Sequence, residues 1–372
     1  MNAAPCILAA ACTFPSGTDI RLADAAVRTQ LALLGRHPVY RDAAGAAPRI
    51  SSFPDEQRYD AARWALLARH ALAQLTQALL PQWDALQAAP RLLWLVVPDA
   101  ERPGMPDGVA ARIGEAMQHP LWPWQRITIV AGGHAAGIDA LLAARQALTE
   151  APGAMAVVLA AESGLAADAL LWLDLQGLLH GAGAPGKAGT RGNPYGRVPG
   201  EGAAAVALAA APPASGPGWA RLLGCATAEE PATLASQRPC TGVGLAQAAR
   251  SAIEQARAHG PARIGHLVAD LNGEPHRADE FGFAAQRLAP ALSEDWQRSA
   301  PALASGDLHD ASAVAHLALA AYGQLRRPRS THTLVLASSD GALRGAAVLG
   351  ASRDIPDLPE IRPWRSPSTS TT

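Results

Sequence analysis

The feature that most limits the possible folds is a repeated alternation of short aliphatic runs with longer helical patterns. In the first part of the chain, runs typical of buried strands lie at 5–11, 91–97, 127–131 and 155–161. Helical patterns lie between them at 59–78, 108–117 and 135–148. A further strand is expected at 203–210, after a cluster of glycines.

The same order of elements begins again after a Pro/Gly/Ser-rich stretch at 212–218. Strands are expected at 220–226, 264–270, 333–337 and 345–349, and helices at 244–259, 279–292 and 311–325. Two successive halves of similar layout predict a duplicated, layered α/β fold. We therefore expect an N-terminal half at 1–212, a C-terminal half at 213–350 and a poorly ordered tail at 351–372.

The composition is that of a globular protein with a sizeable core, because 49% of the 372 residues are hydrophobic and only 17% are charged. The 31 basic and 32 acidic residues are spread without long blocks, so no surface for nucleic acid or an anionic membrane is expected. No apolar stretch reaches the roughly 18 residues that cross a bilayer.

The four cysteines, Cys6, Cys12, Cys225 and Cys240, show no C-x-x-C spacing. We therefore expect neither a zinc site nor a redox pair, and a reduced, cytoplasmic setting. The apolar segment that ends at Cys12 has no basic residue in front of it, which favours a buried first strand over a signal peptide.

Two segments of the first half carry a resemblance to a known family. Residues 127–140, Ile-Thr-Ile-Val-Ala-Gly-Gly-His-Ala-Ala-Gly-Ile-Asp-Ala, resemble the nucleophile elbow of the β-ketoacyl synthases. There a strand turns into a helix and presents a cysteine three residues before a glycine; here His134 holds the cysteine position. Residues 196–208 resemble the family's Gly-x-x-x-Gly-Glu-Gly-Ala-Gly turn, which is the best-preserved motif.

Further matched positions lie in the second half. Asp270 stands where the family has its first catalytic histidine, and Asp307 where it has the second. Ala302 matches the family's lysine, and Lys187 is the only lysine in the sequence. The loop at 337–345 stands where the family has Gly-Phe-Gly-Gly-Thr, so the resemblance spans residues 5 to 350.

This resemblance implies a thiolase-like fold, with two similar α/β halves packed as αβαβα layers, and a dimer with the strand 127–131 at its two-fold axis. It also places His134, Asp270 and Asp307 in one pocket. Condensation needs a thiolate to hold the acyl chain and neutral histidines to stabilise an oxyanion. Because these groups are replaced, we expect no catalytic residue, cofactor or metal.

Two interpretations of the matched trio stay open. A histidine between two carboxylates is stabilised as imidazolium, and the same trio can ligate a divalent metal or serve as a base with its orienting group. Alternatively, Asp270 and Asp307 cap loops or helix starts while His134 merely occupies the vacated elbow. His276 and His309 lie near these loops and are expected to be surface residues.

The resulting hypothesis is a degenerate synthase-like protein that acts as a non-enzymatic scaffold, accessory or adaptor subunit. The resemblance offers two precedents, the chain-length factor that pairs with an active synthase and the degenerate synthase-like proteins found beside bacterial type VI secretion effectors. Expected partners are an identical chain or a synthase-like subunit, with acyl carrier protein or a secretion effector as further candidates. The alternative is an acyltransferase, a 3-oxoacyl-[acyl-carrier-protein] synthase acting on acyl thioesters in fatty acid or polyketide synthesis.

Overall fold

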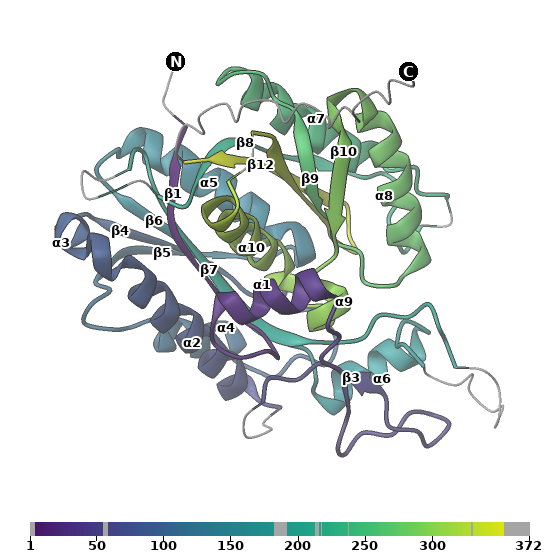
Figure 1. Cartoon of the computed structure of the whole chain (residues 1–372). Helices are drawn as coiled ribbons and strands as arrows, with labels where there is room; N and C mark the ends of the chain where they lie inside the picture. Colours follow the sequence, from purple (N-terminus) through teal and green to yellow (C-terminus); the bar gives the residue numbers. More distant parts are fainter. Residues whose placement is uncertain are drawn as a thin grey trace, which may run out of the picture.

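The first half of the chain forms five strands of a large sheet (Figure 1). The computed structural model describes residues 4–54, 59–181, 192–212, 216, 218–236, 238–328 and 330–352, so the expected tail lies outside them from 353 onward. The five strands lie in the order β1 (Cys6–Thr13), β7 (Glu201–Ala209), β6 (Met155–Ser163), β4 (Arg91–Val96) and β5 (Trp124–Val130). The pairs β1–β7 and β7–β6 are antiparallel, whereas β6–β4 and β4–β5 are parallel.

The second half repeats this pattern. Its strands lie in the order β8 (Ala220–Glu229), β12 (Leu343–Ala351), β11 (His332–Ser338), β9 (Ile264–Val268) and β10 (Leu292–Ser299). Again the first two pairs are antiparallel and the last two are parallel. A short antiparallel contact between β1 and β8 joins the halves. The same order and the same strand directions in both halves indicate an internal duplication.

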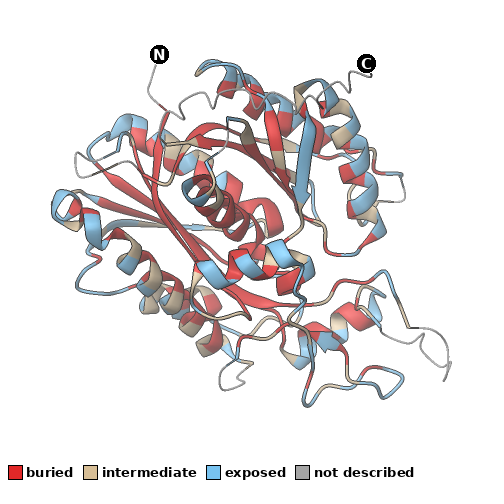
Figure 2. Ribbon diagram, viewed as in Figure 1, coloured by how far each residue is buried: buried red, intermediate tan, exposed pale blue. Residues whose placement is uncertain are grey.

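Helices form three layers around these two groups of strands. The helices α5 (Ala136–Glu150) and α10 (Ser312–Arg326) lie between them and contact strands of both halves. The outer faces are covered by α2 (Ala61–Leu79) and α4 (Val109–Ala116) on the first half, and by α7 (Val243–Arg257) and α8 (Pro275–Leu288) on the second. The αβαβα layering predicted from the sequence is confirmed, because helices pack on both faces of each group of strands and the inner strands are buried (Figure 2).

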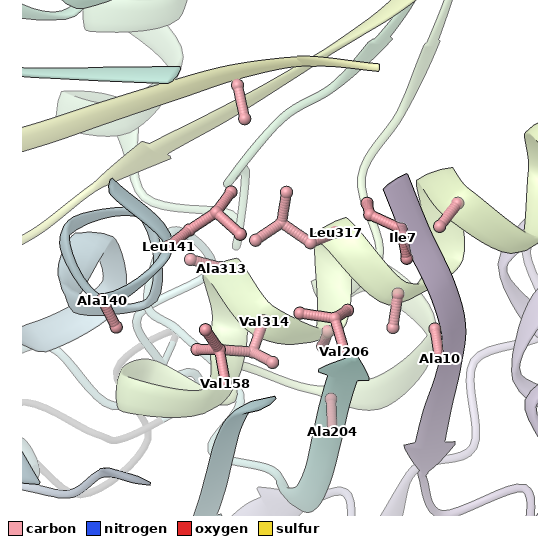
Figure 3. Packing of buried hydrophobic residues seen from close by; sticks show 14 of the residues in the cluster. Ile7, Ala10, Ala140, Leu141, Val158, Ala204, Val206, Ala313, Val314 and Leu317 are labelled. Carbon is pink, nitrogen blue, oxygen red and sulfur yellow. The ribbon is translucent and has the colours of Figure 1, made fainter. Parts of the chain in front are cut away.

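The side chains of strand β7 pack alternately into two hydrophobic cores. Its residues Ala204, Val206 and Leu208 face the central helices, while the alternate alanines face α2, as the two-residue period of a strand requires. Figure 3 shows Val206 and Val158 packed near Val314 and Leu317 of α10. This central layer fixes the starts of α5 and α10, both of which lead to the candidate site.

The remaining described elements are short or peripheral. They are α1 (Ile20–Thr29), α3 (Trp83–Leu86), α6 (Ala167–Leu175), α9 (Ala302–Ser305), β2 (Gly35–Arg36), β3 (Arg49–Ile50), and the 3₁₀ turns η1 (Leu80–Gln82), η2 (Gly133–Ala135), η3 (Ala289–Ala291) and η4 (His309–Ala311). Within the described residues, no helix combines the length and the apolar character needed to span a membrane.

The two edges of the sheet depart from the predictions. The strand β10 was not predicted, because its sequence Leu-Ser-Glu-Asp-Trp-Gln-Arg-Ser lacks the aliphatic run of a buried strand; it lies at an exposed edge. The predicted helix 279–292 instead runs from Pro275 to Leu288. The prediction that 127–131 is a buried strand was wrong for the single chain. This segment belongs to β5, the other edge, which carries exposed residues (Figure 2). Ile129 is 51% exposed there.

Candidate functional site

The elbow is the turn that connects β5 to α5. Gly132 and Gly133 have positive φ angles of 154° and 74°, and a Cβ atom on Gly133 would lie 3.1 Å from the Ser339 hydroxyl oxygen. Glycine is required in such a conformation and such a close approach. His134 follows in η2 and is completely buried. The local sequence thus forms the strand–turn–helix that the resemblance implied.

Two loops of the second half meet the elbow. The Asp310 carboxylate in η4 accepts the Gly133 backbone N–H at 3.1 Å. The Ser339 hydroxyl, which follows β11, accepts the Ala135 N–H at 3.0 Å and donates to the Gly132 carbonyl oxygen at 2.5 Å. These bonds hold the elbow against the ends of β11 and the start of α10. Each loop therefore supplies side chains to the same buried volume.

His134 lies between an acid and a guanidinium group. Its Nε2 atom donates to Asp307 Oδ1 at 2.9 Å, and Arg277 Nη2 lies 3.2 Å from both ring nitrogens. Burial and Arg277 act to lower the pKa of His134, but the charges of Asp307 and Asp270 outweigh them, so that this pKa is raised. The surroundings therefore favour the protonated imidazole more than water does, and an imidazolium has no lone pair with which to attack an acyl group.

Asp307 is satisfied from several sides. Oδ1 also accepts the His309 backbone N–H at 2.9 Å, and Oδ2 accepts the Asn272 amide at 2.7 Å. Burial acts to raise the pKa of Asp307, but His134 and Arg197 hold it well below its usual range. The carboxylate is thus ionised and held in one orientation, as a structural partner of His134.

Asp270 does not bond His134 directly. Its Oδ2 atom lies 3.2 Å from Arg277 Nη1 and accepts the Ser338 backbone N–H at 3.3 Å. Its Oδ1 atom has no hydrogen-bond partner among the described residues. The structure thus brings His134 and Asp307 into contact and places Arg277 between them and Asp270. With a guanidinium in this place, the trio does not form a metal site of three adjacent ligands.

Two arginines that the sequence interpretation did not single out organise this site. Arg277 also bonds Glu274 at 3.2 Å and Asp340 at 2.7 Å. Arg197 bonds the same two acids, Glu274 at 2.9 Å and Asp340 at 3.0 Å. We call this group the charged cluster: His134, Arg197, Asp270, Asn272, Glu274, Arg277, Asp307 and Asp340. One signal was available, because Arg197 lies inside the preserved 196–208 motif.

A second ionic group borders the charged cluster. Arg102 bonds Glu162 at 2.8 Å and Asp310 at 2.7 Å, and His309 Nδ1 lies 2.8 Å from Asp310. The expectation that His309 is a surface residue was wrong, because its side chain is only 19% exposed and its ring packs 4.3 Å from that of His134. Ala302, matched to the family's lysine, is half-buried in α9 and offers no charge.

Little space remains beside these ion pairs. A cavity of about 60 Å³ lies between Arg102, Trp172, Asp307 and His309. Such a volume holds a few water molecules, and it is far smaller than the 300 Å³ or more of ordinary ligand sites. Among the described residues, the elbow therefore opens onto ion pairs rather than onto a tunnel for an acyl chain.

Two like α/β halves, with a strand–turn–helix elbow that meets two loops of the second half, define the thiolase-like fold of the ketosynthases. A chain of a type II polyketide synthase complex of an acyl-carrier protein and its ketosynthase matches with a TM-score of 0.72, 13% identity and coverage of 94% of this chain and all of that one. The ketosynthase from module 6 of the bacillaene synthase of Bacillus subtilis 168 matches with a TM-score of 0.71 and 14% identity, over 94% of this chain and 72% of that one.

A third solved structure includes a partner subunit. It is a ketosynthase in complex with its chain length factor from Xenorhabdus doucetiae, with a TM-score of 0.66, 12% identity and coverage of 94% of this chain and 98% of that one. No family model and no curated protein matches the sequence. At these identities the likeness shows the fold, and the activity has to be argued from the site itself.

Proposed function

We propose that this chain is a catalytically degenerate ketosynthase-like protein that acts as a non-enzymatic scaffold, accessory or adaptor subunit. The observation that carries the proposal is the state of the elbow. His134 is completely buried and bonded to Asp307 at 2.9 Å, with Arg277 at 3.2 Å. An acyl group attached there would displace buried ion pairs, and breaking such a pair costs about 3–5 kcal/mol.

The thiolate that condensation requires has no substitute in the site. Cys12 and Cys225 are buried in the core, where burial raises the pKa of Cys12 and raises that of Cys225 to about 12. A buried thiol of this kind stays protonated near neutral pH and is a poor nucleophile. Neither lies in the elbow, so the first half-reaction has no acceptor.

The second half-reaction lacks its electrophilic groups. At the positions that the resemblance matches to the family's neutral histidines, the sequence has Asp270 and Asp307, whose carboxylates would face a developing enolate. A unit charge about 4 Å away opposes the enolate by roughly 4 kcal/mol at an effective dielectric constant near 20. Arg277 does not reverse this effect, because its guanidinium is already bonded to Asp270, Glu274 and Asp340.

The chain has the ketosynthase-like fold, but ion pairs fill the space at the elbow. We therefore propose that it acts by binding other proteins. Solved proteins of this fold include a ketosynthase bound to its chain length factor and one in complex with an acyl-carrier protein. This supports a synthase-like subunit or an acyl carrier protein as the partner we propose first. A secretion effector is the second partner class. Its motivation is the segment Asp-Leu-Asn-Gly-Glu at 270–274, which resembles the degenerate synthase-like proteins found beside type VI secretion effectors more than a chain-length factor.

Mass spectrometry of the intact protein after incubation with acyl-CoA or acylated carrier protein tests the proposal. We expect no added acyl mass on His134 or on any cysteine. A stable acyl adduct whose amount rises with the amount of folded protein would contradict the proposal and would support the acyltransferase alternative. An active ketosynthase in the same assay provides the positive control.

A further inference from the structure

A group of metal-ligand side chains lies on the outer face of the second half, where α7 and α8 pack side by side (Figure 1). Cys240 lies in the loop before α7, and His276 and Glu280 lie one turn apart at the start of α8. One ligand atom from each residue lies within 4.8 Å of the other two. A spacing of four residues on a helix presents two ligands on one face, as in many zinc sites.

A glycine allows the loop that carries Cys240 to lie close against α8. Gly242 has a φ angle of +63°, and a Cβ atom there would lie 2.5 Å from the Glu280 carbonyl oxygen. Only glycine allows this conformation and this approach. Cys240 and Glu280 are buried, whereas His276 is half-buried. The group is therefore fixed from the protein side and reachable from solvent on the His276 side.

The neighbouring charges suit a bound divalent cation. Glu280 Oε1 accepts a hydrogen bond from the completely buried Arg344 at 2.5 Å, which orients the carboxylate. Partners that orient a ligand in this way are a regular part of metal sites. Glu230 is also buried, and burial together with the charges of Glu280 and Glu230 raises the pKa of the Cys240 thiol to about 11, so the thiol keeps its proton until a cation binds. With a Cys240 thiolate, the two carboxylates, Arg344 and a dication, the local charges cancel.

Comparison with the ionic group beside the charged cluster sharpens the argument. Glu162, His309 and Asp310 also bring three ligand atoms together, but Arg102 already supplies a cation at 2.7–2.8 Å from the two carboxylates. In contrast, His276 has no hydrogen bond or ion pair with any residue that the structure describes. The Cys240 group thus has the ligands of a cation site, and no arginine among the described residues bonds its imidazole.

We propose that Cys240, His276 and Glu280 bind a zinc-class divalent cation, with water in the fourth position. A thiolate, an imidazole and a carboxylate in tetrahedral array suit zinc or cobalt and do not suit magnesium or calcium. On binding, the thiol proton passes to solvent. The metal joins the loop before α7 to α8, whose Arg277 anchors the charged cluster. The site is thus a structural clamp independent of any acyl chemistry.

Cobalt titration of the purified, metal-stripped protein tests this site. We expect one equivalent of Co²⁺ to give a thiolate-to-cobalt charge-transfer band together with the visible bands of tetrahedral cobalt. Cys240→Ser should lose the charge-transfer band. His276→Ala should bind Zn²⁺ at least about 10-fold more weakly in competition with a chromogenic chelator. The matched control is His259→Ala, another half-buried histidine near the end of α7, which should bind zinc like the wild type.

Three results would overturn the proposal. They are the lack of a charge-transfer band at one equivalent of cobalt, the survival of that band in Cys240→Ser, and equal zinc affinity in His276→Ala and the wild type. Circular dichroism of each variant separates the loss of a ligand from the loss of the fold. Because no acyl substrate is used, the outcome is independent of the proposed scaffold function.

Discussion

Arg277 Nη2 lies 3.2 Å from both ring nitrogens of His134, and Arg277 comes from the first turns of α8 while His134 comes from the elbow. The same guanidinium bonds Asp270 at 3.2 Å through Nη1. An arginine thus occupies the space between His134 and Asp270, the two positions that the sequence resemblance matched to catalytic residues. The residues around the elbow are held together as a buried ionic network, and the predictions below test that interpretation.

Replacing Arg277 by methionine should destabilise the protein by about 3–5 kcal/mol, because Asp270 would be left buried without its cation and Glu274 would keep only Arg197. Urea denaturation measures this change. Arg257→Met removes a guanidinium from an exposed pair with Glu254 and should have little effect. Equal stability of the two variants would show that the network contributes nothing to the fold.

The raised pKa of His134 predicts a pH dependence of stability. Because the folded state keeps this proton at a higher pH than the unfolded chain, the contribution of His134 is complete below about pH 6.5 and is lost as the pH rises through the raised pKa. The free energy of unfolding should fall above pH 6.5, by at most about 1.4 kcal/mol per pH unit from this group. In His134→Gln, denaturation between pH 6 and 9 should show a shallower slope; an unchanged slope would refute the assignment.

Restoring a thiol alone should not restore condensation. In His134→Cys the elbow carries a thiol, but the positions that the resemblance matches to the family's two histidines and lysine still hold Asp270, Asp307 and Ala302. Release of CO₂ from malonyl carrier protein and formation of a 3-oxoacyl product should stay at background. Activity above that of the unmodified protein would mean that the substitutions outside the elbow are compatible with catalysis.

The preserved motif at 200–202 should be structural. Glu201 accepts hydrogen bonds from Arg63 at 2.6 and 3.0 Å, from the Phe53 backbone N–H at 2.7 Å and from the Ser163 hydroxyl at 2.8 Å. Glu201→Gln removes the charge that pairs with buried Arg63, so we expect a loss of about 3–5 kcal/mol in urea denaturation. Glu254→Gln, on the exposed pair with Arg257, is the control and should leave stability almost unchanged.

The exposed edge of β5 should be covered by a second subunit. Ile129 is 51% exposed there, whereas the opposite edge strand β10 carries Glu294 and Asp295, charges that discourage pairing. We expect a dimer with β5 near its two-fold axis, formed with an identical chain or a synthase-like subunit. An interface above about 2,000 Å² in total would mark it as obligate.

Light scattering on the purified protein measures its oligomeric state. Ile129→Asp should dissociate a homodimer, because the new charge would be buried without a partner. Val243→Asp, at a β-branched residue that is 47% exposed at the start of α7, should leave the oligomeric state unchanged. A wild-type protein that is a clean monomer at micromolar concentration would contradict the homodimer.

The sequence by itself determined the architecture. Aliphatic runs such as 91–97 and 155–161 correspond to the buried strands β4 and β6, because a strand covered on both faces must be apolar throughout. The resemblance of residues 127–140 to the nucleophile elbow of the β-ketoacyl synthases located the strand–turn–helix and the histidine it presents. These signals are local, since each depends on residues close together in the chain.

Only the tertiary structure decided the chemistry around the elbow. Arg197 and Arg277 bond acids in distant loops, and Cys240 approaches His276 only because α7 and α8 pack together. The aliphatic run at 127–131 indicated a buried strand, and only the resemblance implied an edge, because burial depends on which strands are neighbours in the sheet. An ion pair or a ligand set requires side chains to approach within a few ångströms, and that distance is set by the packing of elements far apart in the chain.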